Sequence, residues 1–362
     1  MVYRVFTHGG NVWAYGGPDR ILDFSSNINP LGPPKLLNVL LYEALDKNIH
    51  TYYPEPSYYE LKRGVSSFLN VKSELIEVFN GASEAIFQIA YALKPSRIIL
   101  TPPSYSEYWR VAQALGKRVH EIPYIINGDK FILDVDKLIK ALNTVRDSLV
   151  YICNPNNPTG TLTDKRYLEE IIESALTRNS HVVVDESFMK FTDIERSVLD
   201  LVEAYKNLHV IVSLTKIFAI PGMRIGVVVT NATRLFEDLL PPWRVNSIVS
   251  YALTRLLDRQ EYTSSYIRDT KSYVKTEMLT LSYRLKRLGL KPYITYTNYI
   301  LVSLPEGLSS SSLTKTLILK HKVLIRDAST IPGLDDHYIR ISLRASKDNM
   351  VLVKSLEETL KC

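Results

Sequence analysis

The chain has 362 residues, of which 46% are hydrophobic and 23% are charged, and its formal net charge is +6. These values are typical of a globular protein large enough for two cores, and they exclude a disordered chain and a small disulfide-rich scaffold. The two cysteines cannot supply a disulfide framework or a cysteine-based metal site, so we expect a cytoplasmic protein without a metal. Basic and acidic residues are interspersed and no apolar run approaches roughly 20 residues, so neither nucleic acid nor a membrane is an expected partner.

Residues 1–35 are rich in Gly, Asn and Pro, which predicts an ordered arm laid over another part of the protein. Helices are predicted at about 35–45 and, after an aromatic turn at 51–59, to about residue 69. Short apolar runs then alternate with helical patterns. The runs that we interpret as strands lie at 78–80, 98–101, 150–153, 182–184, 208–212 and 225–230. This alternation predicts an α/β fold with a mostly parallel sheet between helices.

The alternation breaks at residues 239–243, where a Leu-Leu-Pro-Pro-Trp segment begins a different organisation. A long helical region at about 246–288 leads to strands that we expect near 300–303, 323–325 and 338–343. The chain is therefore predicted to have three parts. They are an arm at 1–35 that joins the small domain, a large domain at 36–240, and a small C-terminal α/β domain at 241–362.

One lysine, Lys216, comes directly after the apolar run at 208–212, at the kind of strand end where α/β sheets bind ligands. Ser213 and Thr215 supply hydroxyl groups beside it, and Arg224 supplies a cation. An amine beside hydroxyls and an arginine suits a carbonyl cofactor that carries a phosphate, because the amine can form a Schiff base. The alternative is an ordinary surface lysine in a polar loop.

Other strand ends carry complementary groups. A Gly-Ala-Ser segment at 81–83 opens a helix that can bind phosphate or that simply begins there. Asp185 follows three valines and can face a protonated ring nitrogen or cap a helix. Asn157 can donate to a phenolate oxygen or make a turn, and Tyr105 can stack on a flat ring or only pack. The joint occurrence of these groups, in this order, favours the functional alternatives.

The motifs that carry a family resemblance are Gly-Ala-Ser at 81–83, Pro-Ser-Tyr-Ser-Glu-Tyr at 103–108, Asn-Pro-Asn-Asn-Pro-Thr-Gly at 154–160, Asp-Glu-Ser-Phe at 185–188, Ser-Leu-Thr-Lys at 213–216 and Gly-Met-Arg-Ile-Gly at 222–226. From about residue 8 to 349 the chain resembles the fold-type I pyridoxal-phosphate enzymes of aminotransferase class I/II. The resemblance implies pyridoxal 5'-phosphate as cofactor, bound by the large domain. It makes Lys216 the Schiff-base lysine and Asp185 the partner of the pyridinium nitrogen.

The same resemblance implies that Asn157 donates to the ring oxygen and that Tyr105 stacks on the ring. The residues that it implies for the phosphate are Ala82, Ser83, Ser213, Thr215 and Arg224. The tyrosine of the Tyr-Pro-Glu-Pro turn, Tyr53, would reach the phosphate of a neighbouring subunit, which implies a homodimer. Phe188 stands where many relatives have tyrosine, so one donor to the ring oxygen is missing and the lysine imine would stay protonated to a higher pH.

Two subfamilies resemble the chain, the histidinol-phosphate aminotransferases and the L-threonine-O-3-phosphate decarboxylases of cobalamin biosynthesis. The second is nearer, on segments that include His-Gly-Gly-Asn at 8–11, the Asn-Ile-Asn-Pro-Leu-Gly-Pro run that begins at residue 27, and Leu-Ile-Arg-Asp-Ala-Ser at 324–329. Alternate residues of a strand share a face, so Arg340 and Arg344 are expected to point the same way. The resemblance makes Arg340 the clamp on the substrate carboxylate, and Arg326 and Arg344 add charge that suits a substrate phosphate.

The resemblance also suggests that His8, Asn27 and Asn29 of the arm contact the substrate phosphate and Asn157 the substrate. We therefore expect a lyase that converts L-threonine O-3-phosphate to (R)-1-aminopropan-2-yl phosphate and carbon dioxide. The bond that breaks is the one held perpendicular to the cofactor plane, so Arg340 is expected to hold the carboxylate out of that plane. The alternatives are an aminotransferase that uses 2-oxoglutarate with histidinol phosphate and a regulatory module that binds the cofactor without catalysis.

Overall fold

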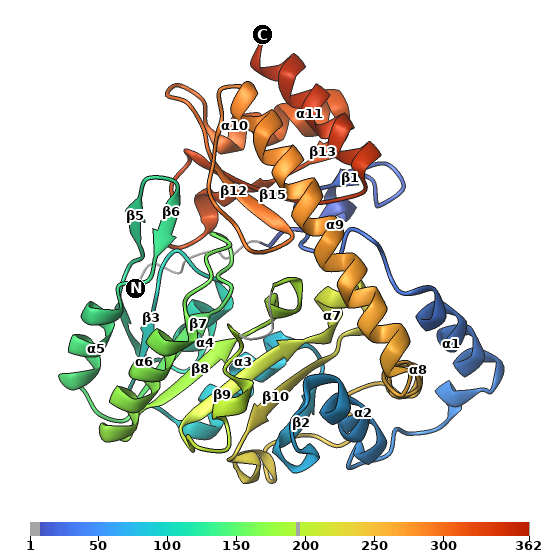
Figure 1. The fold of residues 1–362 in the computed structure, drawn as a ribbon, viewed down its shortest axis with the longest axis vertical. Coiled ribbons are helices and arrows are strands. Elements are labelled where there is room, and N and C mark those ends of the chain that lie inside the picture. The colour runs from blue at the N-terminus through green and yellow to red at the C-terminus, as the bar shows by residue number, and fades with distance from the viewer. Residues whose placement is uncertain (1–7, 193–195, 362) are drawn as a thin grey trace.

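Two large sheets organise the chain in this computed structural model, which describes residues 8–192 and 196–361 (Figure 1). The seven-stranded sheet has the order β2 (Ile76–Phe79), β10 (Gly226–Thr230), β9 (Leu208–Ser213), β8 (His181–Asp185), β7 (Ser148–Cys153), β3 (Arg97–Leu100) and β4 (Arg118–Glu121). The neighbouring strands are parallel except that β10 is antiparallel to both β2 and β9. The fold is therefore α/β with a mostly parallel mixed sheet, as the alternating pattern predicts.

The central strands are apolar because both faces of the sheet are covered. Val182 and Val184 pack in one hydrophobic cluster, whereas Val183 between them packs in a second cluster. Since successive side chains of a strand point to opposite faces, these clusters lie on opposite faces of the sheet. The helices of this part of the chain are α1 (Lys35–Asp46), α2 (Tyr59–Leu69), α3 (Ala82–Leu93), α4 (Glu107–Ala114), α5 (Val135–Asn143), α6 (Lys165–Thr177) and α7 (Leu214–Ile217).

The four-stranded sheet is antiparallel and has the order β11 (Lys291–Pro292), β12 (Tyr299–Ser303), β15 (Tyr338–Ser342) and β14 (Arg326–Asp327). The helices that accompany it are α10 (Ser310–Thr316) and α11 (Ser346–Leu360). Helix α9 (Gln260–Arg287) runs from the lower, larger part of the molecule to this upper part (Figure 1). A separate hairpin joins β5 (Ile125–Asn127) to β6 (Lys130–Ile132).

The N-terminal arm connects to the C-terminal part of the chain. Strand β1 (Leu22–Asp23) pairs in parallel with β13 (Val323–Leu324), and Ser342 N donates to Phe24 O. The division of the chain at residues 35 and 240 stays a prediction. Helix α8 (Ser247–Leu257) lies beyond 240, yet it packs against α1 and α2 of the large part.

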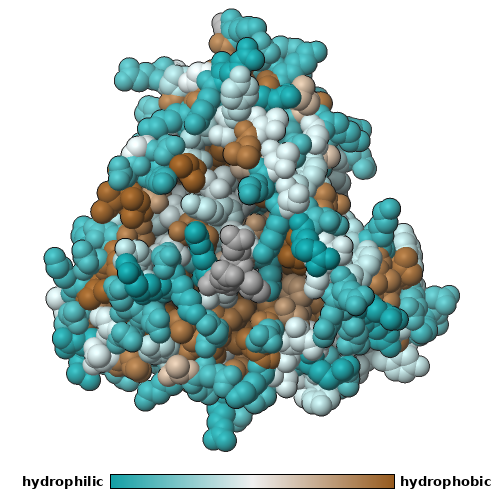
Figure 2. Space-filling model, viewed as in Figure 1, coloured by the Kyte–Doolittle hydropathy of each residue, from teal (hydrophilic) through white to brown (hydrophobic). Residues whose placement is uncertain are grey.

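The surface of the face shown in Figure 2 is mostly hydrophilic, and its hydrophobic residues form separate patches. Helix α1 and the loop after it expose several large hydrophobic side chains. Val39, Tyr42, Tyr52 and Tyr53 all have more than half of their surface exposed. Among the described residues, no helix combines the length and the apolar character that crossing a bilayer requires.

Candidate active site

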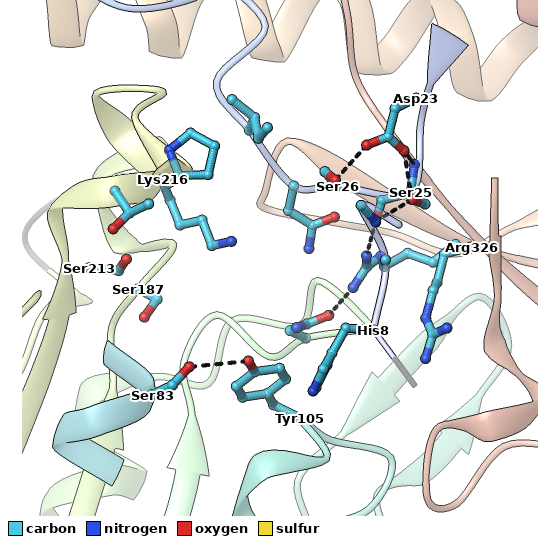
Figure 3. Close-up of a pocket in the computed structure, with 18 of the residues that line it drawn as sticks. His8, Asp23, Ser25, Ser26, Ser83, Tyr105, Ser187, Ser213, Lys216 and Arg326 are labelled. Carbon is cyan, nitrogen blue, oxygen red and sulfur yellow. Dashed lines mark hydrogen bonds between the residues drawn. The ribbon is translucent and has the colours of Figure 1, made fainter. Parts of the chain in front are cut away.

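The carboxyl ends of neighbouring parallel strands meet at one pocket, which Figure 3 shows in close-up. Asp185 ends β8 and pairs with Cys153 at the end of β7, and Lys216 lies on α7 directly after β9. Strands β14 and β15 contribute Arg326 and Arg340 to the same pocket. Groups that are distant in the sequence therefore meet at the edge of the sheet at which α/β proteins bind ligands.

Lys216 directs its amine into this pocket (Figure 3). Burial, with added repulsion from Arg340 and Arg224, lowers the pKa of this amine to about 8. The amine is therefore neutral in a larger fraction of molecules at neutral pH than an ordinary lysine is. A neutral amine is the form that attacks a carbonyl group, so Lys216 is suited to the role of nucleophile.

Asp185 is a buried carboxylate with two neutral donors. Tyr108 OH donates to its Oδ2 over 2.8 Å, and Ser187 N donates to its Oδ1 over 2.9 Å. Burial raises the pKa of Asp185, while Ser187, Tyr108 and the charge of Lys216 act in the opposite direction. A carboxylate in this setting favours a ligand that presents a protonated nitrogen.

The start of α3 and the loop after α7 form a cradle suited to an anion. Gly81 precedes the helix with φ 87°, and a Cβ atom there would lie 2.4 Å from Arg224 Nη2, so glycine lets the guanidinium pack against the helix start. Ala82, Ser83 and Ser213 line the same wall. The backbone N–H groups at a helix N-terminus and an adjacent arginine are the groups that bind phosphate.

Thr215 lines the pocket as predicted, but its hydroxyl is already engaged. Thr215 Oγ1 donates to Ile225 O over 2.9 Å and accepts from Ile225 N over 3.4 Å. This side chain therefore ties α7 to the start of β10, close to Arg224. Its donor is used within the protein, so its contribution to an anion differs from that of Ser83 and Ser213.

Tyr105 and Asn157 also lie in the pocket. The Tyr105 hydroxyl lies 3.5 Å from Ser83 Oγ, and burial raises the pKa of Tyr105 to about 12, so the phenol stays protonated. Asn157 is oriented by Arg340, whose Nη1 donates to Asn157 Oδ1 over 2.6 Å. The amide Nδ2 is consequently the end of Asn157 that can donate to a ligand. Phe188 is buried in the pocket wall and meets Tyr299 edge to face.

Arg326 and Arg340 are directly opposite each other on β14 and β15, and both are buried. Directly opposed residues of an antiparallel pair share a face, and like charges in that arrangement repel. Burial, with the positive charge of Arg326, lowers the pKa of Arg340 to about 10. Burial also lowers the pKa of Arg326. Arg340 Nε has no hydrogen-bond partner within the described residues. Two buried cations and an unsatisfied donor favour an anionic ligand.

Arg344 follows the end of β15 and lines the pocket together with Arg340. Its Nη1 donates to Asp23 O over 3.0 Å, and its Nε lies 3.4 Å from Asp348 Oδ2. The third arginine thus holds the arm and already has a carboxylate partner.

The arm places His8 and Asn27 at the pocket. His8 Nε2 lies 2.7 Å from Glu107 Oε1 at the start of α4, and Ser342 Oγ donates to Asn27 Oδ1 over 2.6 Å. In Figure 3, His8 and Arg326 lie on the side of the pocket away from Lys216. The side chains that would contact the far end of a ligand are therefore a histidine, an amide and arginines.

Two predicted site residues are elsewhere in this single chain. Asn29 is not among the lining residues, because its Nδ2 donates to Ile217 O, Tyr266 OH and Thr270 Oγ1. The predicted contact of Asn29 with substrate is therefore unsupported, and the side chain instead fixes the backbone next to Lys216. Tyr53 is 77% exposed and stacks on Trp243 outside the pocket.

Sequence reasoning missed several residues that shape the pocket. Asp23 accepts from the hydroxyls of Ser25 and Ser26, and all three residues line the pocket. Tyr108 and Ser187 orient Asp185. Both lie within motifs already recognised, and the position of Tyr108 three residues after Tyr105 at the start of a helix was the available signal.

The groups that line the pocket fit one kind of cofactor, a ring that carries a carbonyl, a phosphate and a basic nitrogen. The amine of Lys216 suits the carbonyl, and the helix start with Arg224 suits the phosphate. Asp185 suits the ring nitrogen, because both donors that the described chain gives it are neutral.

Comparisons with known proteins agree with a pyridoxal-phosphate site. A family described as aminotransferase class I and II matches residues 19–357. The chain is 32% identical, over 96% of its length, to the adenosylcobalamin biosynthesis bifunctional protein CobDQ of Leptospira interrogans, of which it spans only 40%. It is 30% identical to the threonine-phosphate decarboxylase of Salmonella typhimurium, covering 98% of this chain and 96% of that protein. The structure resembles the histidinol-phosphate aminotransferase of Clostridium acetobutylicum with a TM-score of 0.85 and 29% identity, covering 94% and 99% of the two chains.

Proposed function

This chain belongs to the aminotransferase class I and II family, which implies dependence on pyridoxal phosphate, and we propose that it is a threonine-phosphate decarboxylase. The proposed reaction converts L-threonine O-3-phosphate to (R)-1-aminopropan-2-yl phosphate and carbon dioxide, a step of cobalamin biosynthesis. The observation that carries the proposal is the pair of buried arginines, Arg326 and Arg340, that face each other across β14 and β15.

The proposed cofactor site follows from the contacts of the strand ends. Lys216 would bind the cofactor covalently, and the Asp185 carboxylate would accept a hydrogen bond from the protonated ring nitrogen. The phosphate would be held by Ala82, Ser83, Ser213 and Arg224, and Thr215 would support this cradle by tying α7 to the start of β10. Tyr105 would stack on the ring and Asn157 Nδ2 would donate to its oxygen. When bound, pyridoxal phosphate supplies an electron sink for negative charge at the α-carbon of the substrate.

The substrate site is proposed on the other side of the pocket. Arg340 would bind the substrate carboxylate, since its Nε is unpaired within the described residues and its Nη1 is fixed by Asn157. Arg326, with Arg344, Asn27 and His8, would face the substrate phosphate. A substrate with both a carboxylate and a phosphate carries enough negative charge to relieve the repulsion between the two opposed arginines.

The residues of the chain would then divide the chemistry among them. Arg340 would orient the carboxylate that leaves as carbon dioxide, and His8 and Asn27 of the arm would line the same side of the pocket. Lys216 Nζ would hold a proton that it can deliver to the α-carbon, because the amine projects into the same pocket as Arg340.

A homodimer is part of the proposal. Val39 and Tyr42 on α1 and Tyr52 and Tyr53 in the segment after it are large exposed side chains, and Tyr53 stacks on Trp243 with ring centroids 4.4 Å apart. Tyr53 lies outside the pocket of its own chain. We propose that a second copy covers these side chains and receives Tyr53 at its own phosphate cradle.

The test compares two substrates on the same purified protein reconstituted with pyridoxal phosphate. L-Threonine O-3-phosphate is supplied without a keto acid and carbon dioxide is measured; in a parallel sample histidinol phosphate is supplied with 2-oxoglutarate and glutamate is measured. We expect carbon dioxide in the first sample and a kcat/KM at least about a hundredfold lower in the second. Glutamate formation without carbon dioxide would instead assign the second candidate, an aminotransferase, which the likeness to the clostridial structure favours.

A further inference from the structure

The carboxylate of Asp185 has a phenol as its closest side-chain donor. Tyr108 OH donates to Asp185 Oδ2 over 2.8 Å, and both side chains are buried. The other oxygen, Oδ1, accepts from the backbone N–H of Ser187. The contact with Tyr108 joins residues 77 positions apart and links the first turn of α4 to the end of β8.

Packing fixes the ring of Tyr108 in this position. It stacks on Tyr151 with centroids 4.9 Å apart and planes 11° apart, and it meets Tyr105 edge to face at 5.8 Å. Tyr151 directs its own hydroxyl away, because it donates to Ile86 O over 2.7 Å. The hydroxyls of these two adjacent tyrosines therefore have different partners, and of the two only the Tyr108 hydroxyl donates to Asp185.

We propose that Tyr108 is a positioning residue that aims Asp185 at the ring nitrogen of the cofactor and keeps the carboxylate ionised. This inference rests on the proposed use of pyridoxal phosphate, but it is independent of the choice between decarboxylation and transamination. Tyr108 itself does not line the pocket within the described chain, so its effect passes through Asp185.

The direction of proton sharing supports this role. Burial raises the pKa of Tyr108 far above its ordinary value, so its proton stays on the phenol. Burial also raises the pKa of Asp185, and the hydrogen bonds from Ser187 and Tyr108 oppose that rise. Without the Tyr108 hydroxyl, Asp185 is expected to take up a proton at a higher pH. The other titratable groups whose charge acts on Asp185, or that respond to it, are Lys216, Tyr105, Cys153, Glu186 and Tyr299.

The experiment uses Tyr108→Phe and, as a matched control, Tyr151→Phe. Each variant removes one hydroxyl and keeps the stacked rings, but only the first removes a donor to Asp185. The dissociation constant of pyridoxal phosphate is measured on the full-length chain by visible absorbance from about pH 5.5 to 9. This range lies between the ordinary pKa values of carboxylates and lysines. Circular dichroism and the melting temperature of each variant without cofactor verify folding.

We expect Tyr108→Phe to weaken pyridoxal phosphate binding by about tenfold or more at the acid end, since a hydrogen bond to a charged group is lost. The loss of affinity on acidification should begin at a higher pH than in the parent, while Tyr151→Phe should match the parent profile. Equal profiles for the parent and Tyr108→Phe would overturn the inference, and so would equal shifts for both variants. A parent protein that fails to bind pyridoxal phosphate would contradict the proposed function instead.

Discussion

Replacing Arg326 by glutamine tests whether the opposed arginines form a substrate anion site. Arg326 is buried directly across from Arg340, and its Nη2 donates to Thr330 Oγ1 over 2.8 Å. In the free protein, Arg326→Gln removes hydrogen bonds of the guanidinium, each worth about 0.5–1.5 kcal/mol, and the attraction of Asp327, and it also removes a repulsion between like charges. These effects oppose each other, so we expect the free energy of unfolding to change by no more than about 1 kcal/mol.

Substrate binding should respond much more strongly than stability. A charge-assisted hydrogen bond to the substrate phosphate contributes about 1.5–3 kcal/mol, which corresponds to a rise in KM of roughly ten- to a hundredfold. Arg344→Gln is the comparison, and its effect should be smaller because the Arg344 side chain is 36% exposed and screened by solvent, whereas Arg326 is buried. Arg326→Lys should recover only part of the affinity, since lysine keeps the charge but lacks the planar fork.

The assay follows carbon dioxide release against the concentration of L-threonine O-3-phosphate, and urea titrations give the stability of each variant without substrate. The reasoning fails if Arg326→Gln leaves KM within about twofold of the parent, a change worth less than about 0.5 kcal/mol. It also fails if KM rises only in proportion to a large loss of stability, because Arg326 would then serve folding rather than binding.

Lys216→Ala should abolish covalent attachment of pyridoxal phosphate, so that borohydride treatment followed by mass spectrometry finds no cofactor adduct at the site; an adduct of unchanged yield would contradict the assignment of this lysine. If Tyr53 acts across a dimer, inactive Lys216→Ala and inactive Tyr53→Ala chains, unfolded and refolded together, should regain activity, because each hybrid contains one intact site; no regain would indicate action within one chain. Burial raises the pKa of Glu186 to about 7, so the folded protein binds more protons than the unfolded chain between about pH 4.5 and 7, and stability falls as pH rises through that window. Glu186→Gln should therefore gain roughly 1–3 kcal/mol over the parent between pH 5 and 8 in urea titrations, and a constant difference would refute the reasoning.

The central strands could be predicted because burial on both faces requires continuous apolar runs, and 208–212 and 182–184 are such runs. Strand β4 could not, since it lies at the edge of the sheet and its Arg-Val-His-Glu sequence is largely exposed. The β5–β6 hairpin could not be predicted for the same reason, because its isoleucines are exposed and do not alternate with polar residues.

The pocket followed from the order of polar residues at strand ends, because parallel strands bring their carboxyl ends to one edge. Lys216 and Asp185 were found in this way. The surroundings of Asn29 and Tyr108 depend on how the arm and α4 dock, and their partners lie many residues away in the sequence. Side-chain contacts of this kind arise from tertiary packing, so the spacing of Tyr108 from Tyr105 could indicate a position on a helix but not the partner, Asp185.

The claim that the protein is a decarboxylase is tested most directly with L-threonine O-3-phosphate labelled at the carboxyl carbon. The labelled substrate is incubated with the pyridoxal-phosphate-loaded protein in the absence of any keto acid, and the gas and the amine product are analysed together. The account predicts labelled carbon dioxide and an equal amount of unlabelled 1-aminopropan-2-yl phosphate. Unlabelled gas with the label left in the substrate would contradict it, and so would label in a keto acid when a second sample receives 2-oxoglutarate.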